Sequence, residues 1–453
     1  MASALPFFAE QVSAHQQLTA FFYIFATLGV FIGVIAITLI DAGMVQRKNL
    51  IDTVVQKMLC AFISGLAFML VGYAIWNYQY YQAFAVPDAL WQAVQDWWLA
   101  GANLTRFAQS IDPAGVAEGD TYQVFSIFFF CFAGLSAALV HGAGLERIKP
   151  AASYLTSAFI GAVMVPVLSY LTYGSTSPLT NAGLHDFVGA YTLYMLVGVW
   201  AVVLAWRLGP RRVIAAQPGN PLLSAGGFLM LMVAIPMFVL GCGFMVPDAG
   251  YFGPTMTNSG LGIIFSNVFL TFAGGAISGG LIAYRKGKPL YILSGPIAGY
   301  MTCTALFDII VPWQALVISL FGPFILIGGE ALMRRLGIDD PKVAPLALGP
   351  SVFSTLLAGV VGAGIAQGGY SGIKDGEFAF QHAHISLGMQ LEGVLIVIAI
   401  SAVAALLVSW LIERSVGLRV SAAVEDAGLD ASYWSLPPAA AQDNSGSARV
   451  VTL

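Results

Sequence analysis

The feature that most constrains the fold of this chain is a series of long apolar segments separated by short polar loops. A helix needs about 20 apolar residues to cross the hydrocarbon core of a bilayer. Runs of this kind occupy residues 19–40, 53–78, 122–144, 151–174, 187–207, 222–246, 260–284, 290–308, 310–333, 345–369 and 387–412. Only 9% of the residues are charged and 58% are hydrophobic, whereas soluble proteins carry about 25% charged residues. The sequence therefore predicts an all-α polytopic membrane protein with about eleven transmembrane helices.

Several other classes of function lack the residues that they require. The net charge is −4, and no basic run would neutralise phosphates, so we expect no nucleic-acid partner. The four cysteines stand alone in apolar runs, which indicates buried thiols rather than a metal site. We find no nucleophile–base pair, metal cluster or phosphate-binding loop, and we expect neither an enzyme nor a cofactor. Residues 1–18 lack the pattern of a cleaved signal peptide, so the first apolar run is predicted to be a retained helix.

The distribution of Lys and Arg predicts the orientation in the membrane. All but two of the 19 basic residues fall in alternate loops, the exceptions being Arg106 and Lys374. Basic loops face the cytoplasm in most membrane proteins. We therefore expect an extracytoplasmic N-terminus over 1–18, a membrane domain over 19–416 and a cytoplasmic tail over 417–453, in the cell (inner) membrane with the lipid bilayer around it.

Two further patterns predict local structure. The long loop 79–121 contains Trp91, Trp97 and Trp98, and tryptophan favours the membrane interface. We expect a surface helix in this loop, at the outer headgroup level. Small residues recur three or four positions apart in GAGL (142–145), GGAISGG (274–280) and SGPIAG (294–299), which is typical of helices that approach closely in a bilayer.

Five segments, in order along the chain, resemble motifs of the ammonium transporter (Amt/Mep/Rh) family: DAGMVQRKN (41–49), HGAGLERIKP (141–150), HDFVGAYTLYMLVG (185–198), GIDDPKVAPLALGP (337–350) and SVGLRVSAAVEDAGLD (415–430). This resemblance implies the ammonium-transporter fold, in which two inverted five-helix repeats and a last long helix enclose one pore per protomer. It also implies a homotrimer, a small-molecule solute such as ammonium or ammonia, and a cytoplasmic face that binds PII-type regulators.

The resemblance assigns residues to the outer half of the pore. Asp186 is expected to structure the outer vestibule and to favour a cation, and its place at a predicted helix start also suits a cap of backbone N–H groups. Tyr173 and Cys242 correspond to the outer cation site, where the thiol accepts hydrogen bonds less well than a hydroxyl. Phe132 and Phe238 correspond to two stacked rings that close the pore below the vestibule.

The middle of the pore departs from the family pattern. Family members typically carry two facing histidines there, and the corresponding positions in this chain are Tyr194, eight residues after Asp186, and Leu348, before Gly349. The five histidines of the chain lie elsewhere, at 15, 141, 185, 382 and 384. Histidine titrates near pH 6.5, whereas tyrosine titrates near pH 10. A Tyr–Leu pair therefore offers no proton relay, and neutral species are favoured over a relayed cation.

Three hypotheses remain open at this point. The first is conduction of ammonium or ammonia by an altered mechanism, which the family resemblance supports. The second is a channel of the same fold for another small neutral solute or gas, which the residues at 194, 242 and 348 motivate. The third is a non-conducting sensor or regulatory relative, which the Gly-Leu-Arg-Val and Gly-Leu-Asp elements of the tail motivate.

Overall fold

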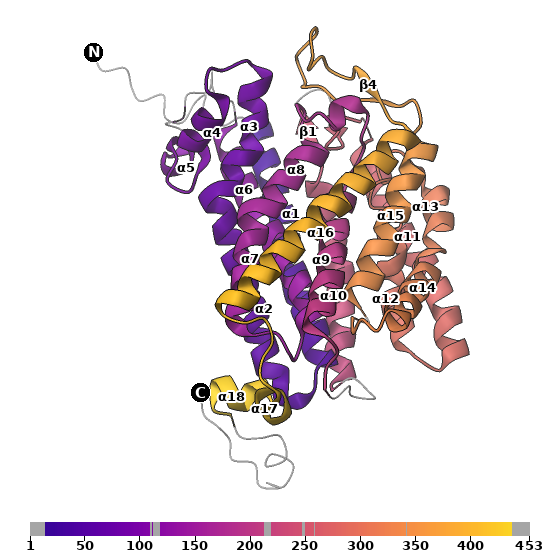
Figure 1. The fold of residues 1–453 in the computed structure, drawn as a ribbon. Coiled ribbons are helices and arrows are strands. Elements are labelled where there is room, and N and C mark those ends of the chain that lie inside the picture. The colour runs from indigo at the N-terminus through magenta and orange to yellow at the C-terminus, as the bar shows by residue number, and fades with distance from the viewer. Residues whose placement is uncertain are drawn as a thin grey trace.

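The computed structural model describes residues 14–108, 111, 118–212, 219–246, 250–257, 259–340 and 342–436. Within these residues the chain is a bundle of helices with only two small β-hairpins (Figure 1). Ten helical segments of this part are long and apolar enough to cross a membrane, and an eleventh apolar helix, Leu290–Met301, is shorter. The predicted all-α polytopic membrane fold is confirmed.

Three of the first five spans contain a π-helical turn. The elements in order are α1 (Ala14–Met44), η2 (Arg47–Asn49), α2 (Leu50–Ala67), η3 (Phe68–Gly72), α3 (Tyr73–Ala83), α4 (Ala89–Trp97), α5 (Ala102–Thr105), α6 (Gly119–His141), η5 (Gly142–Gly144), α7 (Pro150–Phe159), η6 (Ile160–Met164), α8 (Val165–Tyr173), η7 (Thr180–Ala182), η8 (Ala190–Met195) and α9 (Leu196–Leu208). The π-helical turns are η3, η6 and η8. Such turns inside α-helices often mark functional sites.

The second half adds six apolar segments and two short helices of the tail. The elements are α10 (Pro221–Gly241), β1 (Phe244–Val246), β2 (Gly250–Phe252), α11 (Leu261–Lys286), α12 (Leu290–Met301), α13 (Pro312–Ser319), α14 (Gly322–Arg335), α15 (Val343–Val361), β3 (Ala366–Gln367), β4 (Ala383–His384), α16 (Leu387–Ser415), α17 (Ala422–Ala427) and α18 (Leu429–Trp434). Strands β1 and β2 pair antiparallel, as do β3 and β4.

Several predicted span boundaries differ from the observed helices, among them the end of the span 345–369, because α15 ends at Val361. The run 222–246 is helical only to Gly241, because the chain turns there into the hairpin of β1 and β2. The first helix begins at Ala14 rather than at residue 19, so the predicted extracytoplasmic segment 1–18 shares five residues with α1 (14–18) and otherwise lies outside the described residues. Residues 437–453 of the predicted tail also lie outside them.

The predicted span 290–308 is helical only to Met301. Residues 302–309 continue as a buried series of turns. Side chains of neighbouring helices bond the backbone groups that a helix would otherwise satisfy: Asn267 donates to the carbonyls of Phe307 and Ile310, and the Ser354 hydroxyl accepts from the N–H of Ala305. Irregular backbone at membrane depth is tolerated when protein groups satisfy it in this way.

Two of the small-residue motifs pack against each other. A Cβ on Gly275 of α11 would lie 2.2 Å from the carbonyl oxygen of Gly295 in α12, and a Cβ on Gly279 would lie 2.5 Å from the carbonyl oxygen of Tyr291. Only glycine permits this approach of the two backbones. The prediction that GGAISGG and SGPIAG bring helices together is confirmed.

The two ends of the bundle differ in what they carry (Figure 1). The hairpins and α4 and α5 lie at one end, here called the β end, and α17 and α18 lie at the opposite end, here called the tail end. The long helix α16 crosses the bundle from one to the other. At the tail end Lys48 and Arg212 contact Glu425 and Asp426 of α17, so loops that the Lys/Arg distribution placed on one side meet there. We take the tail end as the predicted cytoplasmic side.

The loop 79–121 contains the helix α4. Trp97 is buried against Tyr73 at 5.4 Å between ring centroids, and its indole N–H donates to the hydroxyl of Tyr81. Trp91 is exposed. The predicted helix in this loop is present. Its tryptophans differ in surroundings, since Trp97 packs into the bundle rather than lying at the surface.

Candidate functional site

Two cavities lie in the bundle. The outer cavity, toward the β end, has a volume of about 30 Å³ and is lined by Trp76, Phe125, Phe128, Phe129, Phe132, Tyr173, Phe187, Gly241, Cys242, Phe244 and Pro254. The inner cavity, toward the tail end, has a volume of about 50 Å³ and is lined by Ile37, Ile40, Leu135, Leu139, Tyr194, Phe228, Leu231, Ile235, Phe238, Ile297, Tyr300, Met301, Lys342 and Leu346. Of the seven predicted site residues, five line one of these two cavities, and Asp186 and Leu348 line neither.

The outer cavity is an aromatic cage. The rings of Trp76 and Phe129 lie 4.9 Å apart, and Phe125 stacks on Phe128 at 5.5 Å. Electron-rich ring faces attract cations, and tryptophan does so best. Trp76 was missed by sequence reasoning because it lies inside the apolar run 53–78, where nothing separates a ring that faces a cavity from one that faces lipid.

Tyr173 and Cys242, which the family resemblance assigns to an outer cation site, both line this cage. Tyr173 ends α8, and Cys242 directly follows α10. The thiol of Cys242 donates to the carbonyl of Phe238 at 3.4 Å. Burial raises the pKa of the Cys242 thiol, and the nearby Asp186 raises it further, so at neutral pH the cage contains a neutral thiol rather than a thiolate.

Phe132 and Phe238, the predicted pair of rings, line one cavity each. Phe132 of α6 lines the outer one, and Phe238 of α10 lines the inner one. The ring of Phe132 pairs with Phe129 at 6.2 Å, and the ring of Phe238 pairs with Tyr300 at 6.4 Å and 90°. Each ring is thus held by a different aromatic neighbour, and both are buried. Apolar side chains at this point require a permeating molecule to shed its water.

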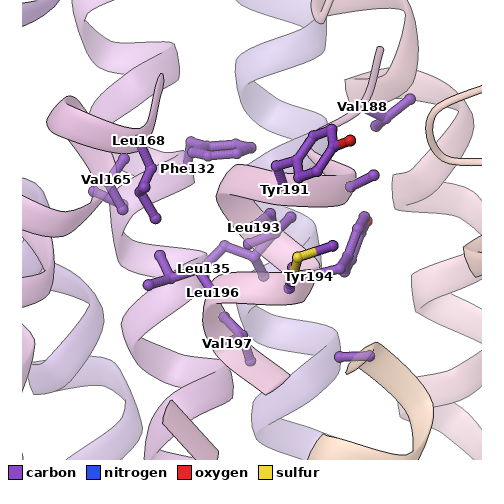
Figure 2. Close-up of a cluster of buried hydrophobic side chains, with 14 of the residues drawn as sticks. Phe132, Leu135, Val165, Leu168, Val188, Tyr191, Leu193, Tyr194, Leu196 and Val197 are labelled. Carbon is purple, nitrogen blue, oxygen red and sulfur yellow. The ribbon is translucent and has the colours of Figure 1, made fainter. Parts of the chain in front are cut away.

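The inner cavity has apolar walls with one pair of hydroxyls. Tyr194 lies in the π-helical turn η8, and its hydroxyl is 2.9 Å from that of Tyr300 near the end of α12. Figure 2 shows Tyr194 and Leu193 of this turn beside Phe132 and Leu135 of α6. The π-helical turn carries both Tyr191 and Tyr194, of which Tyr191 bonds Gln390 of α16 instead. The Tyr300 partner was missed, since it follows an ordinary small-residue motif.

Leu348 does not line either cavity. Its backbone N and Cα would lie 2.9 Å from a Cβ built on Gly198, so Leu348 occupies the close contact between α15 and α9. From the same helix start, Lys342 and Leu346 line the inner cavity instead. At the two positions where the family usually has histidines, this chain therefore has Tyr194, whose side chain lines the inner cavity, and Leu348, which packs between α15 and α9.

Asp186 is fully buried at the beginning of the η8–α9 segment. Its carboxylate accepts hydrogen bonds from the N–H groups of Phe187 and Ala190 and from that of Tyr191, at 2.7 to 2.9 Å. Burial raises the pKa of Asp186 to about 6, although these hydrogen bonds lower it. The two interpretations of Asp186, a helix cap and a charge near the vestibule, are compatible with this geometry.

None of the histidines in the described residues lines either cavity. His185, expected in an outer loop, is fully buried, with its ring nitrogens near Asp308, Gln367 and Thr255. Burial lowers the pKa of His185, but Asp308 outweighs this and raises it above the usual value. His141 is buried in α6, where Nε2 lies 3.3 Å from Oε1 of Gln56. His382 and His384 are exposed at the β end.

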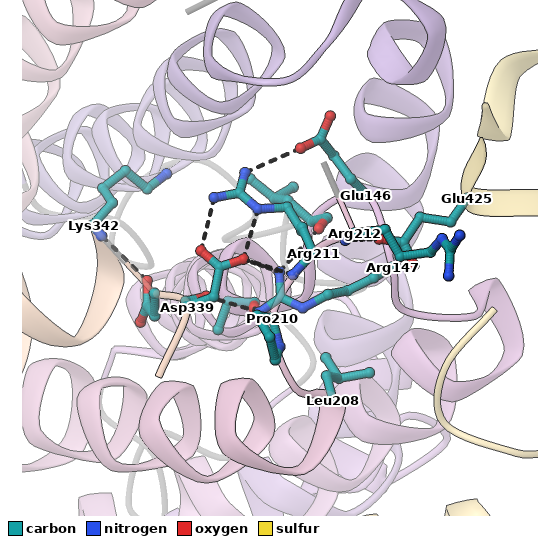
Figure 3. A network of polar contacts seen from close by, with 12 residues as sticks. Glu146, Arg147, Leu208, Pro210, Arg211, Arg212, Asp339, Lys342 and Glu425 are labelled. Atoms are coloured by element: carbon teal, nitrogen blue, oxygen red, sulfur yellow. Dashed lines mark hydrogen bonds and ion pairs between the residues drawn. The ribbon is translucent and has the colours of Figure 1, made fainter. Parts of the chain in front are cut away.

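Polar residues of four family-like motifs meet at the tail end (Figure 3). The guanidinium of Arg211 makes two hydrogen bonds to Asp339, at 2.8 and 2.9 Å, and one to Glu146 at 3.0 Å. Glu146 also accepts from the side chain of Asn49, and Arg419 of the tail pairs with Glu425. Burial raises the pKa of Asp339, but its bonds to Arg211 outweigh this and hold it below the usual range. The cluster joins distant loops into one platform.

Comparison with known proteins agrees with this geometry. A sequence model of the Ammonium Transporter Family matches residues 20–435. The chain is 27% identical to ammonium transporter Amt2 of Archaeoglobus fulgidus, over 86% of this chain and 82% of that protein. It is 23% identical to ammonium transporter Amt1 of Methanocaldococcus jannaschii, over 93% and 96% respectively.

Solved structures share the fold. A protein described as "Sensor Amt Protein" superposes with a TM-score of 0.70 at 21% identity, covering 92% of this chain and 98% of that one. Mep2 of Candida albicans superposes with a TM-score of 0.68 at 18% identity, covering 91% and 88%.

Proposed function

Because the chain belongs to the ammonium transporter family, we propose that it conducts ammonia across the membrane as the neutral molecule, without a histidine proton relay. The outer aromatic cage recruits ammonium near Asp186. The cation leaves its proton on the outer side, and neutral ammonia passes Phe132 and Phe238 into the inner cavity.

The observation that carries the proposal is the Tyr194–Tyr300 hydroxyl pair in an otherwise aliphatic and aromatic cavity. A hydroxyl both donates and accepts a hydrogen bond, so the pair can bond the lone pair or an N–H group of ammonia. A tyrosine pKa near 10 leaves both groups protonated and neutral, with no vacant site for a proton. Placing ammonium there without a charged partner would cost several kcal/mol in lost hydration.

The outer cage supports recruitment of the cation. Trp76, Phe129 and Tyr173 supply ring faces for a cation within the lining of one cavity. Cys242 replaces the hydroxyl that the family resemblance led us to expect, and a thiol accepts hydrogen bonds weakly. We therefore propose a weaker ammonium site than that of family members with a hydroxyl at this place.

The test is a paired measurement on proteoliposomes that contain the purified protein. Ammonium-triggered current reports charge movement, and an internal pH dye reports entry of neutral ammonia. We expect a dye signal above that of protein-free liposomes, without a current. A saturable current would contradict the proposal, because charge would then cross without the twin histidines. Dye signals equal to those of empty liposomes would also contradict it.

A sensing role is the second candidate. It rests on the fold similarity to the protein described as a sensor and on the contacts that tie the tail to the bundle, where Trp434 donates to Asp52 and Asp430 accepts from the N–H groups of Ile51 and Asp52. Saturable ammonium binding without flux would favour this role. Flux of another small uncharged solute, without ammonia flux, would favour the remaining alternative.

We further propose that the protein assembles as a homotrimer in the cell membrane, with the N-terminus outside and the tail in the cytoplasm, and that a PII-type protein binds the tail end. The family resemblance and the Lys/Arg distribution support these statements. Native mass spectrometry in detergent tests the trimer, and labelling of a single cysteine introduced in the tail of sealed vesicles tests the orientation. A pull-down with purified PII protein tests the partner.

A further inference from the structure

A buried ion triplet lies at the inner end of the pathway. Asp41 of α1 and Lys57 of α2 are both fully buried, and the Lys57 amine lies 2.5 Å from one Asp41 oxygen. Lys342, directly before α15, pairs with the other oxygen of the same carboxylate. Charged groups within membrane-spanning segments are costly and usually mark function. None of these residues entered the sequence-based prediction of the site.

The two lysines have different surroundings. The Lys57 amine also donates to the carbonyl of Ala138 in α6 and is enclosed by helices on all sides. Lys342 lines the inner cavity, and its side chain keeps 15% of its surface exposed. Among the lining residues of that cavity it alone carries a charged group, since the other polar side chains are Tyr194 and Tyr300.

Hydrogen bonds to the backbone hold Lys342 in place. Asp340 accepts hydrogen bonds from the N–H groups of Lys342, Val343 and Ala344, which holds the first turn of α15. The N-terminus of a helix carries a partial positive charge. Both amines pair with the one carboxylate of Asp41, and that of Lys342 faces the cavity together with the helix start. Burial lowers the pKa of Lys342 to about 7, so its amine is positively charged below that pH and loses the charge above it.

We infer that Lys342 determines the charge selectivity of the pore: held by Asp41 at the inner end of the cavity, its amine repels cations and lets only neutral solutes pass. The inference rests on the proposed conduction of neutral ammonia and adds the group that excludes ammonium. A positive side chain in a narrow pore excludes cations electrostatically. Two like charges about 5 Å apart, at an effective dielectric constant of about 20, repel strongly enough to reduce occupancy more than tenfold.

The test compares Lys342→Met with Lys342→Arg and with Lys288→Met. Methionine matches the lysine stem without charge and leaves the Asp41–Lys57 pair as a neutral unit, whereas arginine keeps the charge. Lys288 is an exposed residue between α11 and α12, so its removal alters the net charge equally without touching the cavity. The thermal unfolding of each variant in detergent shows that it is folded before reconstitution.

Current and dye signals are then recorded as for the unaltered protein. We expect Lys342→Met to gain an ammonium-dependent current on the order of tenfold above the background, whereas Lys342→Arg and Lys288→Met stay without current. A Lys342→Met protein that passes ammonia but no current would overturn the inference and leave the proposed function intact. If the unaltered protein passes no ammonia, the proposed function fails. In that case an ammonium current in Lys342→Met would still show that Lys342 excludes cations. Absence of current in Lys342→Met would overturn the inference as well as the proposed function.

Discussion

Asp186 and Asp340 play the same part in front of two neighbouring helical segments, η8–α9 and α15. Each buried carboxylate accepts three backbone N–H groups of the segment that follows it. Tyr194 and Leu348 both lie eight residues further on. The two helices pack against each other at Gly198 and Leu348. This equivalence is what an inverted repeat produces. It places Tyr194 and Leu348 at matching positions of the two halves, although only Tyr194 lines a cavity.

Removal of the Asp340 carboxylate should destabilise the protein. Asp340→Ala leaves three N–H groups at the start of α15 without their acceptor, and loss of a helix cap typically costs about 1–2 kcal/mol. We expect Asp340→Ala to have a lower midpoint of thermal unfolding in detergent than the unaltered protein. The midpoint of Asp340→Asn should lie between the two, since its amide oxygen still accepts hydrogen bonds. Asp375→Ala, in the exposed loop between β3 and β4, is the control. An unchanged midpoint for Asp340→Ala would show that the cap is dispensable.

Cation recruitment should weaken as the pH falls through 6. Burial raises the pKa of Asp186 to about 6, so its negative charge is present above that pH and lost below it. We expect the dissociation constant of methylammonium, which stays charged throughout, to rise between pH 7 and pH 5 when measured by calorimetry. Asp186→Asn carries no charge at either pH and should bind weakly at both. Equal affinity of the unaltered protein at both pH values would argue against a role for this charge.

The hydroxyl of Tyr194 should matter for ammonia flux. Tyr194→Phe keeps the ring in the inner cavity but removes one of its two hydroxyls, and an unmade hydrogen bond costs about 1–3 kcal/mol. We expect the dye-detected flux to fall roughly tenfold. Tyr191→Phe is the matched control, because its hydroxyl bonds Gln390 and lines neither cavity. If both variants conduct alike, the hydroxyl pair is not part of the pathway.

The sequence predicted the fold better than the pathway, for a physical reason. Long apolar runs and their loops define the spans directly, since the bilayer requires a fixed length of apolar helix. Within a span, however, lipid-facing and cavity-facing positions are both apolar, so Trp76 and Tyr300 carried no signal. The same limit hid the end of α12 at Met301, where side chains rather than composition satisfy the backbone.

Charged residues within the spans were the signal that sequence reasoning left unused. Asp41 directly follows the predicted span 19–40 and Lys57 lies within the predicted span 53–78, and charged groups at such depth seldom occur without a partner. Which partner they have depends on how α1, α2 and α15 meet in space. The family resemblance assigned Asp186 and Phe238 to the pore. One of its motifs (337–350) also contains Lys342, but the resemblance gave that residue no role.

The ring of Phe238 should separate the two cavities, and its removal should broaden the range of solutes. Phe238→Ala removes a buried ring that packs against Tyr300, which should cost about 3–5 kcal/mol in stability and join the outer cavity to the inner one. We expect the flux of methylamine, measured with the same dye, to increase several-fold relative to that of ammonia. Phe228→Ala is the control: it makes the same change in the same helix and the same cavity, ten residues (about three turns) before Phe238. Because Phe228 lies farther than Phe238 from Gly241 and Cys242, the residues at the end of α10 that line the outer cavity, its loss enlarges the inner cavity without joining the two. Equal gains in both variants would mean that cavity size alone, rather than the ring at the boundary, sets the selectivity for size.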